Sequence, residues 1–306
     1  MSAIPGGKLR AYWELGKPRL SAMAVFAVVA GAYLAWPWPR THPPLGLLVA
    51  TTLGTFLAAV GAAALNMYRE RHLDPLMERT MGRPLPTGRL SPREVKWFGA
   101  IVAGLGVLCV LLGGAPNTGD GTHSLQDLNW VAAGLCALIV VSYVAVYTPM
   151  KVRTPLNTLV GAIPGGLPPV VGHAAVAGRL EMAQAVLFAI LFCWQIPHFL
   201  SIAWRYREDY ARAGMLMLPV VDPTGHRTAI TMLLYVAGLG IASLLPYTLH
   251  MADERYAMVA VLLDLLFFVP TCLAALTRKD SAMRMTFITS IIYLPLLLLA
   301  MVWWRK

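Results

Sequence analysis

The chain has 306 residues, of which 58% are hydrophobic and 13% are charged, and its mean hydropathy is +0.62. Folded soluble domains keep about 25% charged residues to cover their surface, so this composition excludes a water-soluble globular protein and predicts a protein embedded in lipid. The net charge of +10 does not indicate nucleic-acid binding, because the basic residues are divided among many connections and no polar segment is long enough to form a soluble domain.

Nine apolar segments are long enough to cross a bilayer as helices, which need about 20 residues each. In chain order they are Leu20–Trp38, Leu45–Tyr68, Trp97–Gly114, Trp130–Thr148, Leu156–Ala177, Met182–Trp204, Thr228–Leu249, Tyr256–Leu276 and Met285–Trp304. The fifth contains Pro164, Pro168 and Pro169, which remove backbone donors, so it requires shielding by neighbouring helices. The sequence therefore predicts an all-α membrane protein with nine transmembrane helices, organised as one domain over residues 1–306.

The basic residues are divided unevenly between the two sides of this predicted topology. With nine spans, 20 of the 25 lysines and arginines fall on the side of the N-terminus, so the positive-inside rule places the N-terminus in the cytoplasm and the C-terminus in the periplasm. The first apolar run is too long for a signal-peptide core, and no mitochondrial presequence precedes it, which favours the inner (plasma) membrane of a bacterium. Two cytoplasmic connections, 67–96 and 205–227, are the predicted active-site loops.

Three oxygen-bearing side chains follow one another at the end of the second span. Asn66, Glu70 and Asp74 stand four residues apart, a spacing that keeps side chains on one face of a helix. Oxygen ligands of this kind suit Mg²⁺, which bridges carboxylates to substrate phosphates. The same residues are equally compatible with a solvated helix end whose charges mark the membrane interface.

Basic residues on the same side of the membrane indicate an anion site. Arg79 and Arg83 follow the carboxylates directly, and carboxylates followed by arginines favour a diphosphate that arrives with its metal. Tyr147 and Lys151 stand four residues apart at the end of the fourth span, with Arg153 just beyond. The positive-inside bias explains some of these arginines without a ligand, and an interfacial tyrosine beside snorkelling cations is the alternative for the second group.

The sixth span carries polar side chains within the membrane and acidic ones past its end. Gln195 and His198 lie inside the span, where polar groups are costly and therefore candidates for function, with a helix-to-helix hydrogen bond as the alternative. Glu208 and Asp209 follow on the cytoplasmic side and mirror the carboxylates after the second span. Asp264 in the eighth span is a lone buried acid to which the sequence assigns no partner.

These motifs resemble the UbiA superfamily of intramembrane prenyltransferases. The stretch from Asn66 to Gly88 carries the superfamily signature N-x-x-x-[DE]-x-x-x-D followed by R-T-x-x-R-P-L-P-x-G. Within the superfamily the chain is similar to the protohaem IX farnesyltransferases through motifs that occur in family order. They are K-P-R at 17–19, Y-T-P-x-K and R-T-P-x-N within 147–157, G-x-x-P-P-V-x-G at 165–172, W-Q-x-P-H-F at 194–199 and E-D-Y-x-x-A-G-x-x-M-L-P-V at 208–220.

The resemblance implies a nine-helix UbiA-type bundle that joins farnesyl diphosphate to a vinyl group of protohaem IX, with water supplying a hydroxyl and diphosphate released. Mg²⁺ is the implied cofactor, and haem is a substrate. The residues implied to hold the metal from two opposite walls are Asn66, Glu70, Asp74, Glu208 and Asp209. Those implied to contact the diphosphate, or for the first two a haem propionate, are Lys17, Arg19, Arg79, Arg83, Lys151 and Arg153. Tyr147 and His198 complete the implied catalytic set, and His198 would orient haem, ligate its iron or help to deliver water.

Three positions depart from the family pattern. Glu70 stands where many bacterial members have Asp, which keeps a carboxylate on a longer arm. His173 stands where the family more often has Trp, so it is a poor candidate for a haem ligand. Pro75 biases Asp74 away from helical geometry, so the placement of Asp74 as a metal ligand depends on the local backbone.

Two other functions and two kinds of partner are considered. A UbiA-type transferase acting on a quinone precursor or a chlorophyllide would share the first signature, and only the W-Q-x-P-H-F region separates it from the haem enzymes. A transporter would need polar residues through the whole membrane, whereas here they cluster at one face. The expected partners are the lipid bilayer and a downstream haem-modifying or oxidase-assembly protein.

Overall fold

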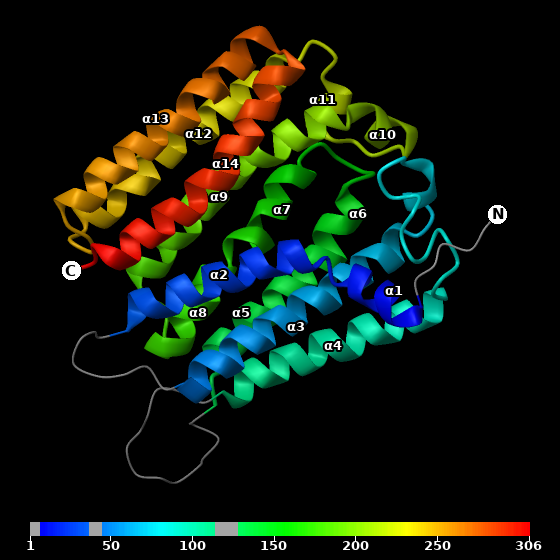
Figure 1. Cartoon of the computed structure of the whole chain (residues 1–306), viewed down its shortest axis with the longest axis horizontal. Coiled ribbons are helices and arrows are strands. Elements are labelled where there is room, and N and C mark those ends of the chain that lie inside the picture. Colours follow the sequence, from blue (N-terminus) through cyan, green and yellow to red (C-terminus); the bar gives the residue numbers. More distant parts are fainter. Residues whose placement is uncertain (1–6, 37–44, 114–127) are drawn as a thin grey trace.

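Helices form almost all of the computed structural model, which describes residues 7–36, 45–113 and 128–306, with the side chains of residues 18–20 left out. The α-helices of Figure 1 are α1 (Lys8–Leu15), α2 (Pro18–Ala35), α3 (Leu45–Glu70), α4 (Pro92–Leu112), α5 (Trp130–Val141), α6 (Thr148–Met150), α7 (Asn157–Gly166), α8 (Pro168–Ala177), α9 (Met182–Arg205), α10 (Arg207–Arg212), α11 (Leu218–Val221), α12 (His226–Thr248), α13 (Glu254–Thr277) and α14 (Asp280–Trp303). A 3₁₀ turn covers Asp74–Leu76, and a π-helical turn, Ser142–Tyr147, joins α5 to α6. The predicted all-α class is confirmed in these residues.

Eight helical segments within the described ranges are long and apolar enough to cross a membrane, so the chain is an integral membrane protein. They are α3, α4, Trp130–Met150, Asn157–Ala177, α9, α12, α13 and α14. The first segment predicted from sequence forms α2, whose apolar part, Ser21–Ala35, is shorter than the other eight. Residues 37 and 38 of that prediction and residue 114 of the third span lie outside the described residues.

The fifth span is divided into two helices. Helix α7 ends at Gly166 and α8 begins at Pro168, because the consecutive prolines 168 and 169 cannot donate backbone hydrogen bonds to the preceding turn. This segment has 78% of its window buried inside the protein, against 22–50% for the other seven. The expectation that neighbouring helices shield it is therefore confirmed.

Close helix contacts in the bundle depend on glycine. A Cβ atom added to Gly172 of α8 would lie 1.9 Å from the carbonyl oxygen of Val28 in α2, and one added to Gly31 would lie 2.0 Å from that of Pro169. The pair α3 and α4 approaches in the same way at Gly54 and its neighbours. Small residues allow helix backbones to meet inside a membrane, where packing rather than water exclusion drives association.

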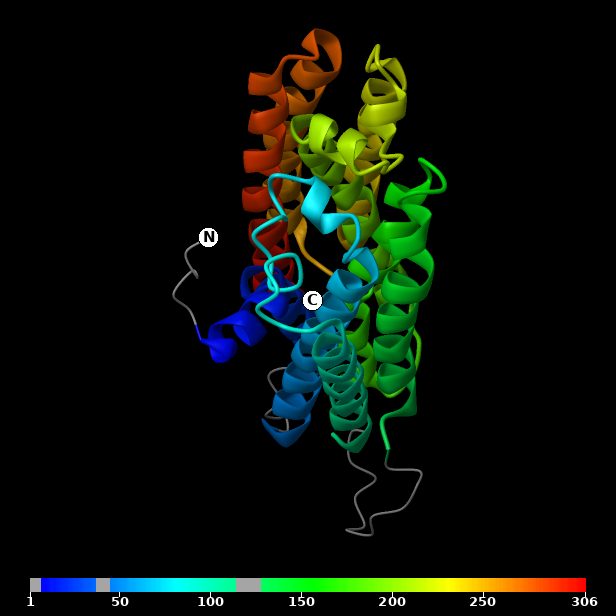
Figure 2. The ribbon, with the colours of Figure 1, turned by 90° about the vertical axis from the view of Figure 1, so that its right-hand side faces the viewer.

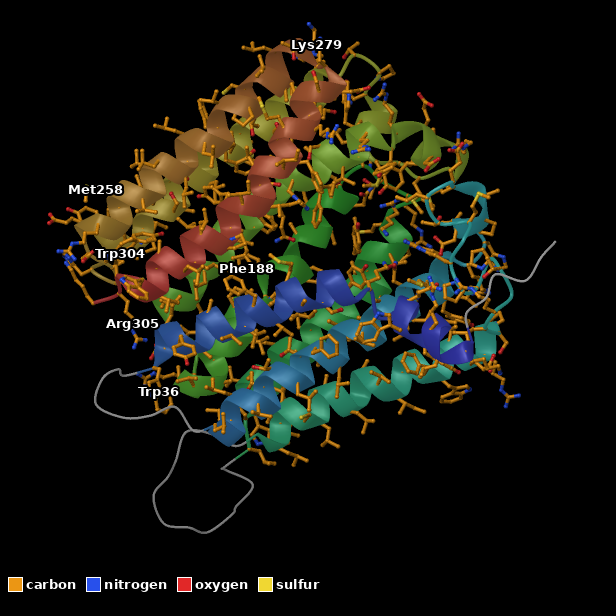
Figure 3. The ribbon with its side chains drawn as sticks, in the orientation of Figure 1. Trp36, Phe188, Met258, Lys279, Trp304 and Arg305 are labelled. Carbon is orange, nitrogen blue, oxygen red and sulfur yellow. The ribbon has the colours of Figure 1, made fainter. Side chains whose placement is uncertain are left out.

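The first long helix also contacts the last. Alanines of α2 belong to the same buried apolar cluster as leucines of α14, and the guanidinium of Arg305 donates to the carbonyl oxygen of Tyr33. Figure 3 shows Trp36, Trp304 and Arg305 close together at one end of the bundle. The end of α2 therefore meets the C-terminal end of the chain, while α1 lies at the other end of the bundle (Figure 1).

The two predicted active-site loops lie together at the opposite end of the bundle (Figures 1 and 2). The carboxylate of Asp209 accepts hydrogen bonds from the backbone N–H groups of Glu78 and Arg79, at 3.4 Å each. The first loop is shorter than the predicted 67–96, because α3 continues to Glu70 and a capping box at Ser91 begins α4. The second, predicted as 205–227, contains the short helices α10 and α11.

Candidate active site

The three oxygen ligands predicted from the sequence lie at the loop end of α3, although not on one helix. Asn66 and Glu70 belong to α3, which ends at Glu70, and Asp74 begins the 3₁₀ turn that follows. The predicted helical stripe is therefore wrong at its third member, because Pro75 cannot continue the α-helix. The three side chains are nevertheless all buried, with exposed fractions of 1%, 4% and 0%.

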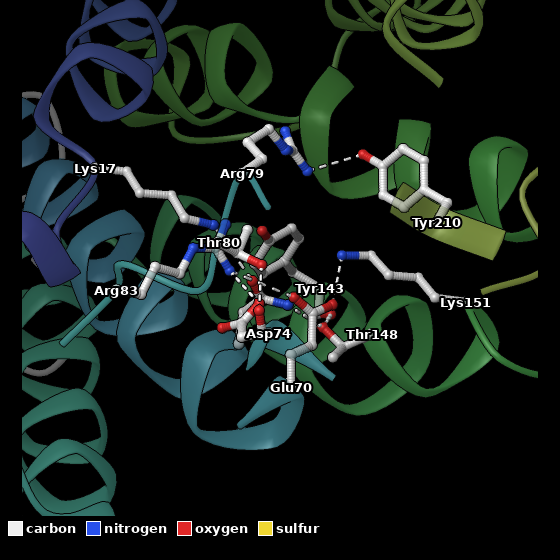
Figure 4. A network of polar contacts seen from close by, with 11 residues as sticks. Lys17, Glu70, Asp74, Arg79, Thr80, Arg83, Tyr143, Thr148, Lys151 and Tyr210 are labelled. Carbon is white, nitrogen blue, oxygen red and sulfur yellow. Dashed lines mark hydrogen bonds and ion pairs between the residues drawn. The ribbon is translucent and has the colours of Figure 1, made fainter. Parts of the chain in front are cut away.

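Arg83 holds the two carboxylates together. Its Nη1 lies 2.7 Å from Asp74 Oδ1 and 4.0 Å from Glu70 Oε2. The arginine comes from the loop after the 3₁₀ turn, and Thr80 Oγ1 donates to the carbonyl oxygen of Asp74 at 2.8 Å. Figure 4 shows these side chains converging on one point. The R-T-x-x-R segment thus folds back over the carboxylates that precede it.

Lys151 forms the second ion pair with Glu70. Its Nζ lies 2.6 Å from Glu70 Oε1 and 4.7 Å from the centre of the Tyr147 ring. Burial alone would lower the pKa of Lys151, but the Glu70 carboxylate outweighs it and raises the pKa above its ordinary value. The Asn66 amide donates to Thr148 Oγ1 at 3.0 Å, which links the segment Trp130–Met150 to α3.

Lys17 enters the same cluster from the turn between α1 and α2. Its Nζ donates to Asn66 Oδ1 at 3.3 Å, and its backbone has φ +44°, a left-handed conformation rare for a residue that is not glycine. Burial, reinforced by the neighbouring Arg83, lowers the pKa of Lys17 to about 7. Lys17, Asn66, Glu70, Asp74, Arg83 and Lys151 are called the polar cluster below. The side chain of Arg19, predicted to act beside Lys17, lies outside the described part of the chain.

The polar cluster has the chemistry to hold a magnesium ion with the help of a phosphate. Asp74 Oδ2 is a buried carboxylate oxygen with no hydrogen-bond partner among the described residues, and such an atom is costly unless a cation satisfies it. Among the described residues no three Asp, Glu, His or Cys side chains are gathered closely enough to form a metal site by themselves. Mg²⁺ commonly takes one or two carboxylates and completes its shell with water and substrate phosphates, which fits this donor set.

The second acidic pair occupies a different position from the polar cluster. The carboxylate of Asp209 contacts Arg212 and the two loop N–H groups already described, while Glu208 is exposed. Among the described residues, the hydrogen bonds and ion pairs of Asp209 go to Glu78, Arg79 and Arg212 and not to Glu70 or Asp74. Asp209 therefore fastens one loop to the other, and this resting structure does not bring the two walls of the predicted metal site together.

Arg79 and Arg153 also lie apart from the polar cluster. The Arg79 guanidinium donates to the Tyr210 hydroxyl at 3.0 Å and lies 4.9 Å from the centre of the Tyr206 ring. It lines a recess of about 450 Å³ between the two loops, and Figure 4 shows its side chain turned toward Tyr210. Arg153 is exposed.

His198 lies in α9 against α14. Its Nδ1 is 2.7 Å from Ser290 Oγ, and its ring stacks between Trp194 and Phe287, with ring centres 4.9 and 5.2 Å away. The single hydroxyl hydrogen of Ser290 is donated to the carbonyl oxygen of Phe287 at 2.6 Å. In that arrangement His198 donates from Nδ1–H and keeps the lone pair on Nε2, whereas a Ser290 hydroxyl that donates to Nδ1 selects the other tautomer. Gln195, its neighbour, donates to the carbonyl oxygen of Leu191 at 2.9 Å.

Two positions that support the candidate site were missed in the sequence. Thr148 hydrogen-bonds to Asn66, and the buried Asn157 donates to the carbonyl oxygens of Thr154 and Leu216, at 2.6 and 2.9 Å. Asn157 thereby attaches the second loop to the connection that carries Lys151. The available signal was their place inside the Y-T-P-x-K and R-T-P-x-N motifs, but both have small neutral side chains that a search for charges overlooks.

Comparisons with known proteins agree with this geometry. Residues 24–292 match the UbiA prenyltransferase family. The chain belongs to this family. A curated relative from Solibacter usitatus (strain Ellin6076), named Protoheme IX farnesyltransferase, is 43% identical over 295 residues, which cover 94% of this chain and 96% of the relative. A protein of the same name from Myxococcus xanthus (strain DK1622) is 38% identical over 283 residues, with 92% and 90% covered.

Solved UbiA-type structures share the fold at low sequence identity. A structure described as digeranylgeranylglyceryl phosphate synthase superposes with a TM-score of 0.75 at 18% identity and covers 96% of this chain and 97% of that chain. A UbiA homologue from Archaeoglobus fulgidus bound to DMAPP and Mg²⁺ gives a TM-score of 0.62 at 16% identity, covering 95% and 98%. These neighbours confirm the predicted UbiA-type bundle.

Proposed function

We propose that this UbiA prenyltransferase transfers the farnesyl group of farnesyl diphosphate to a vinyl group of protohaem IX, with addition of water, to give haem O and diphosphate. The acceptor is supported by the near full-length relatives at 38–43% identity that carry the name Protoheme IX farnesyltransferase. The observation that carries the chemistry is the polar cluster, in which buried carboxylates are paired with Lys151 and Arg83 at the loop end of a membrane bundle.

The cations of the polar cluster are proposed to bind the diphosphate. Breaking the allylic C–O bond leaves both bonding electrons on the diphosphate, and donors aimed at its oxygens stabilise that charge as it forms. Lys151 and Arg83 hold carboxylates in the resting structure, so substrate binding exchanges these partners for phosphate oxygens. Lys17, whose ammonium group hydrogen-bonds to the neutral Asn66 amide and has no acidic partner within 4 Å among the described residues, is the third donor. Arg79 and Arg153 are proposed to join from the loops.

The carboxylates that the exchange releases are proposed to hold Mg²⁺. Glu70, Asp74 and the Asn66 amide supply its oxygen ligands, with Glu208 and Asp209 joining only if the second loop moves. When bound, the ion withdraws charge from the diphosphate as a Lewis acid. The Archaeoglobus fulgidus homologue bound to DMAPP and Mg²⁺ supports this use of a divalent metal.

The haem is proposed to lie against the wall formed by α9 and α14. Trp194, His198 and Phe287 present stacked flat rings there, which suit a planar porphyrin, and the Nε2 lone pair of His198 is available to iron or to the water that adds after prenylation. Ser290 fixes the ring orientation through Nδ1. Tyr147 is proposed to position Lys151 through the contact of its ring with the ammonium group.

The same proposal covers topology and location. Nine spans, with α2 as the first, an inner bacterial membrane and a cytoplasmic active site agree with the 20 to 5 division of basic residues. The loops 71–91 and 206–225 would then form one cytoplasmic cap over the polar cluster within a single domain. Delivery of the product to a downstream haem-modifying protein stays a prediction.

Product analysis tests the function directly. Purified protein in detergent is incubated with protohaem IX, farnesyl diphosphate and Mg²⁺, and the haem fraction is analysed by mass spectrometry. We expect hydroxyethylfarnesyl haem, and we expect it to disappear with EDTA. Diphosphate release with an aromatic quinone precursor but not with haem would instead assign the other UbiA acceptor class.

A further inference from the structure

An apolar groove lies outside the polar cluster, between α1 and the lipid-facing sides of α3 and α4. It has a volume of about 630 Å³ and is lined almost entirely by apolar atoms. The lining residues are Leu9, Arg10, Tyr12, Trp13, Gly16, Phe56, Val60 and Phe98. Gly16 keeps the floor open, because a Cβ there would lie 3.3 Å from the Val60 side chain. This set is called the α1 groove.

The α1 groove has the orientation and depth of one membrane leaflet. Val60 and Phe56 lie ten and fourteen residues before Glu70, the loop end of α3, so at 1.5 Å per residue they lie about 15 and 21 Å deeper. One leaflet of the hydrocarbon core is about 15 Å thick, so Val60 lies near the middle of the bilayer and Phe56 slightly beyond it. At the mouth, Leu9 and Trp13 are 85% and 64% exposed and stand four residues apart, as expected of a helix that lies in the interface.

Among the described ion pairs beside the groove, the positive charges outnumber the negative ones. Lys8 pairs with Glu94 at 2.9 Å, and Arg89 pairs with Glu14 at 2.6 Å. Arg10 also reaches Glu14, but at 3.3 Å and with 65% of its side chain exposed, so it shares an acid that Arg89 already neutralises. Arg10 is the cation that lines the groove itself.

We propose that the α1 groove is a binding site for an anionic phospholipid, with one acyl chain along Phe56, Val60 and Phe98 and the head group on Arg10. The apolar lining and the leaflet depth match an acyl chain, and the excess positive charge at the mouth selects an anionic head group over a zwitterionic one. The site lies on the face of α3 and α4 that the polar cluster does not use, so the lipid is bound in addition to the substrates.

Native mass spectrometry of the full chain tests this site. Delipidated protein in detergent is titrated with equal amounts of dioleoyl phosphatidylglycerol and dioleoyl phosphatidylcholine. We expect one phosphatidylglycerol to be retained, with a preference over phosphatidylcholine of about tenfold. Arg10→Gln should bring the two lipids to nearly equal binding, and Val60→Trp, which fills the groove, should remove the retained lipid.

Matched variants on other surfaces control for general effects of charge and size. Arg284→Gln removes an exposed arginine, and Val261→Trp adds the same bulk to α13, where Val261 is 43% exposed; both should bind as the parent protein does. Should Val60→Trp fail to fold, the loss of head-group selectivity in Arg10→Gln still tests whether the lipid binds at this site. Equal binding of both lipids to the parent, retention by Val60→Trp, displacement by farnesyl diphosphate, or a lipid-free dimer that Val60→Trp abolishes would each overturn the proposal.

Discussion

Charge compensation in the polar cluster has a thermodynamic consequence at the scale of single residues. Glu70 and Asp74 already have cationic partners at 2.6 and 2.7 Å, so a metal ion alone must compete with Lys151 and Arg83. A diphosphate alone must in turn compete with the carboxylates for the same cations. Each ligand removes the obstacle to the other, and their binding should therefore be mutually favourable.

We expect Mg²⁺ to bind weakly to the free protein and about 5 to 150 times more tightly when inorganic diphosphate is present. Calorimetric titration, corrected for complexes formed in the buffer, measures the difference. Lys151→Met should tighten the binding of Mg²⁺ alone and weaken that of diphosphate, which reduces the coupling. Equal Mg²⁺ affinities with and without diphosphate would contradict the exchange of partners.

Glu70→Gln should lower turnover by about 10²- to 10³-fold, because it replaces a negatively charged ligand of the proposed Mg²⁺ site with a neutral amide. Folding should survive, since the amide oxygen still accepts the hydrogen bond from Lys151. Product formation and thermal unfolding are measured together. The matched control is Glu181→Gln, in the capping box at the start of α9, which should leave turnover unchanged. Normal activity of the Glu70 variant would remove this residue from the metal site.

Asp222 governs a pH-dependent part of the stability of the second loop. Its Oδ2 accepts from Thr228 N and Oγ1 at 2.8 and 3.0 Å. Burial raises the pKa of Asp222, but these hydrogen bonds outweigh it and hold the pKa below its ordinary value. The ionised carboxylate is thus favoured by folding, so its contribution is complete above the unfolded pKa of about 3.9 and is lost as the pH falls through the folded pKa.

We expect Asp222→Ala to lower the free energy of unfolding by about 1–3 kcal/mol at pH 7, because Thr228 loses its acceptor. The deficit should shrink as the pH approaches 3, which thermal melts in detergent at several pH values would show. Asp222→Asn keeps one acceptor oxygen and should lie between the parent and the alanine variant. A deficit that does not change with pH would assign the effect to packing instead.

The sequence predicted the members of the polar cluster better than their arrangement. Motif spacing identified Asn66, Glu70 and Lys151, because each stands at a fixed position in a recognisable sequence motif. It could not predict that Lys151 pairs with Glu70, because 81 positions separate them and only the packed bundle brings them together. The exposed Glu208 shows the converse, since an acidic side chain near a motif need not point to its centre.

At the scale of helices, glycine positions decide which faces meet. The contact between α2 and α8 leaves no space for a methyl group at Gly172, where a Cβ would lie 1.9 Å from backbone oxygen. We expect Gly172→Ala to destabilise the protein by about 1–3 kcal/mol or more, as overpacking forces the helices apart. The midpoint of thermal unfolding in detergent measures this.

Gly104→Ala is the matched control on α4, since no atom lies within 4 Å of its added Cβ. It should be neutral or stabilise the helix by about 1 kcal/mol. Equal effects of the two alanines would mean that α2 and α8 separate easily.

Helix existence followed from hydropathy, but helix irregularities did not. The proline pair marked a weak point in the fifth predicted span, but the break between α7 and α8 was not predicted, and the π-helical turn Ser142–Tyr147 has no signal in an apolar run. A π-turn depends on neighbouring helices that absorb its altered hydrogen bonds. The pattern of a single sequence indicates the propensity of a segment to form a helix, whereas the packing of neighbouring helices determines the local backbone conformation here.

At the scale of the whole molecule, the topology separates into two questions. The number of spans from α3 to α14 determines on which side of the membrane the C-terminus lies relative to the start of α3. Whether α2 crosses the membrane determines the side of the N-terminus. Eight full spans between the start of α3 and the end of α14 return the chain to the side from which α3 begins. The charge bias predicts that this side is the outside. We expect alkaline phosphatase fused after Lys306 to be active and a fluorescent protein fused before Met1 to be bright in a bacterial host. A dark N-terminal fusion beside an active C-terminal one would show that α2 does not cross.

The contact between α2 and α14 also determines when the molecule can be completed. Helix α2 is among the first segments to leave the ribosome, and the partner that covers its flank is the last long helix. At synthesis rates of about 5–20 residues per second, the intervening chain takes on the order of ten seconds or more to appear. During that interval, the flank of α2 that α14 later occupies must be covered by lipid, by the helices already made or by other membrane proteins.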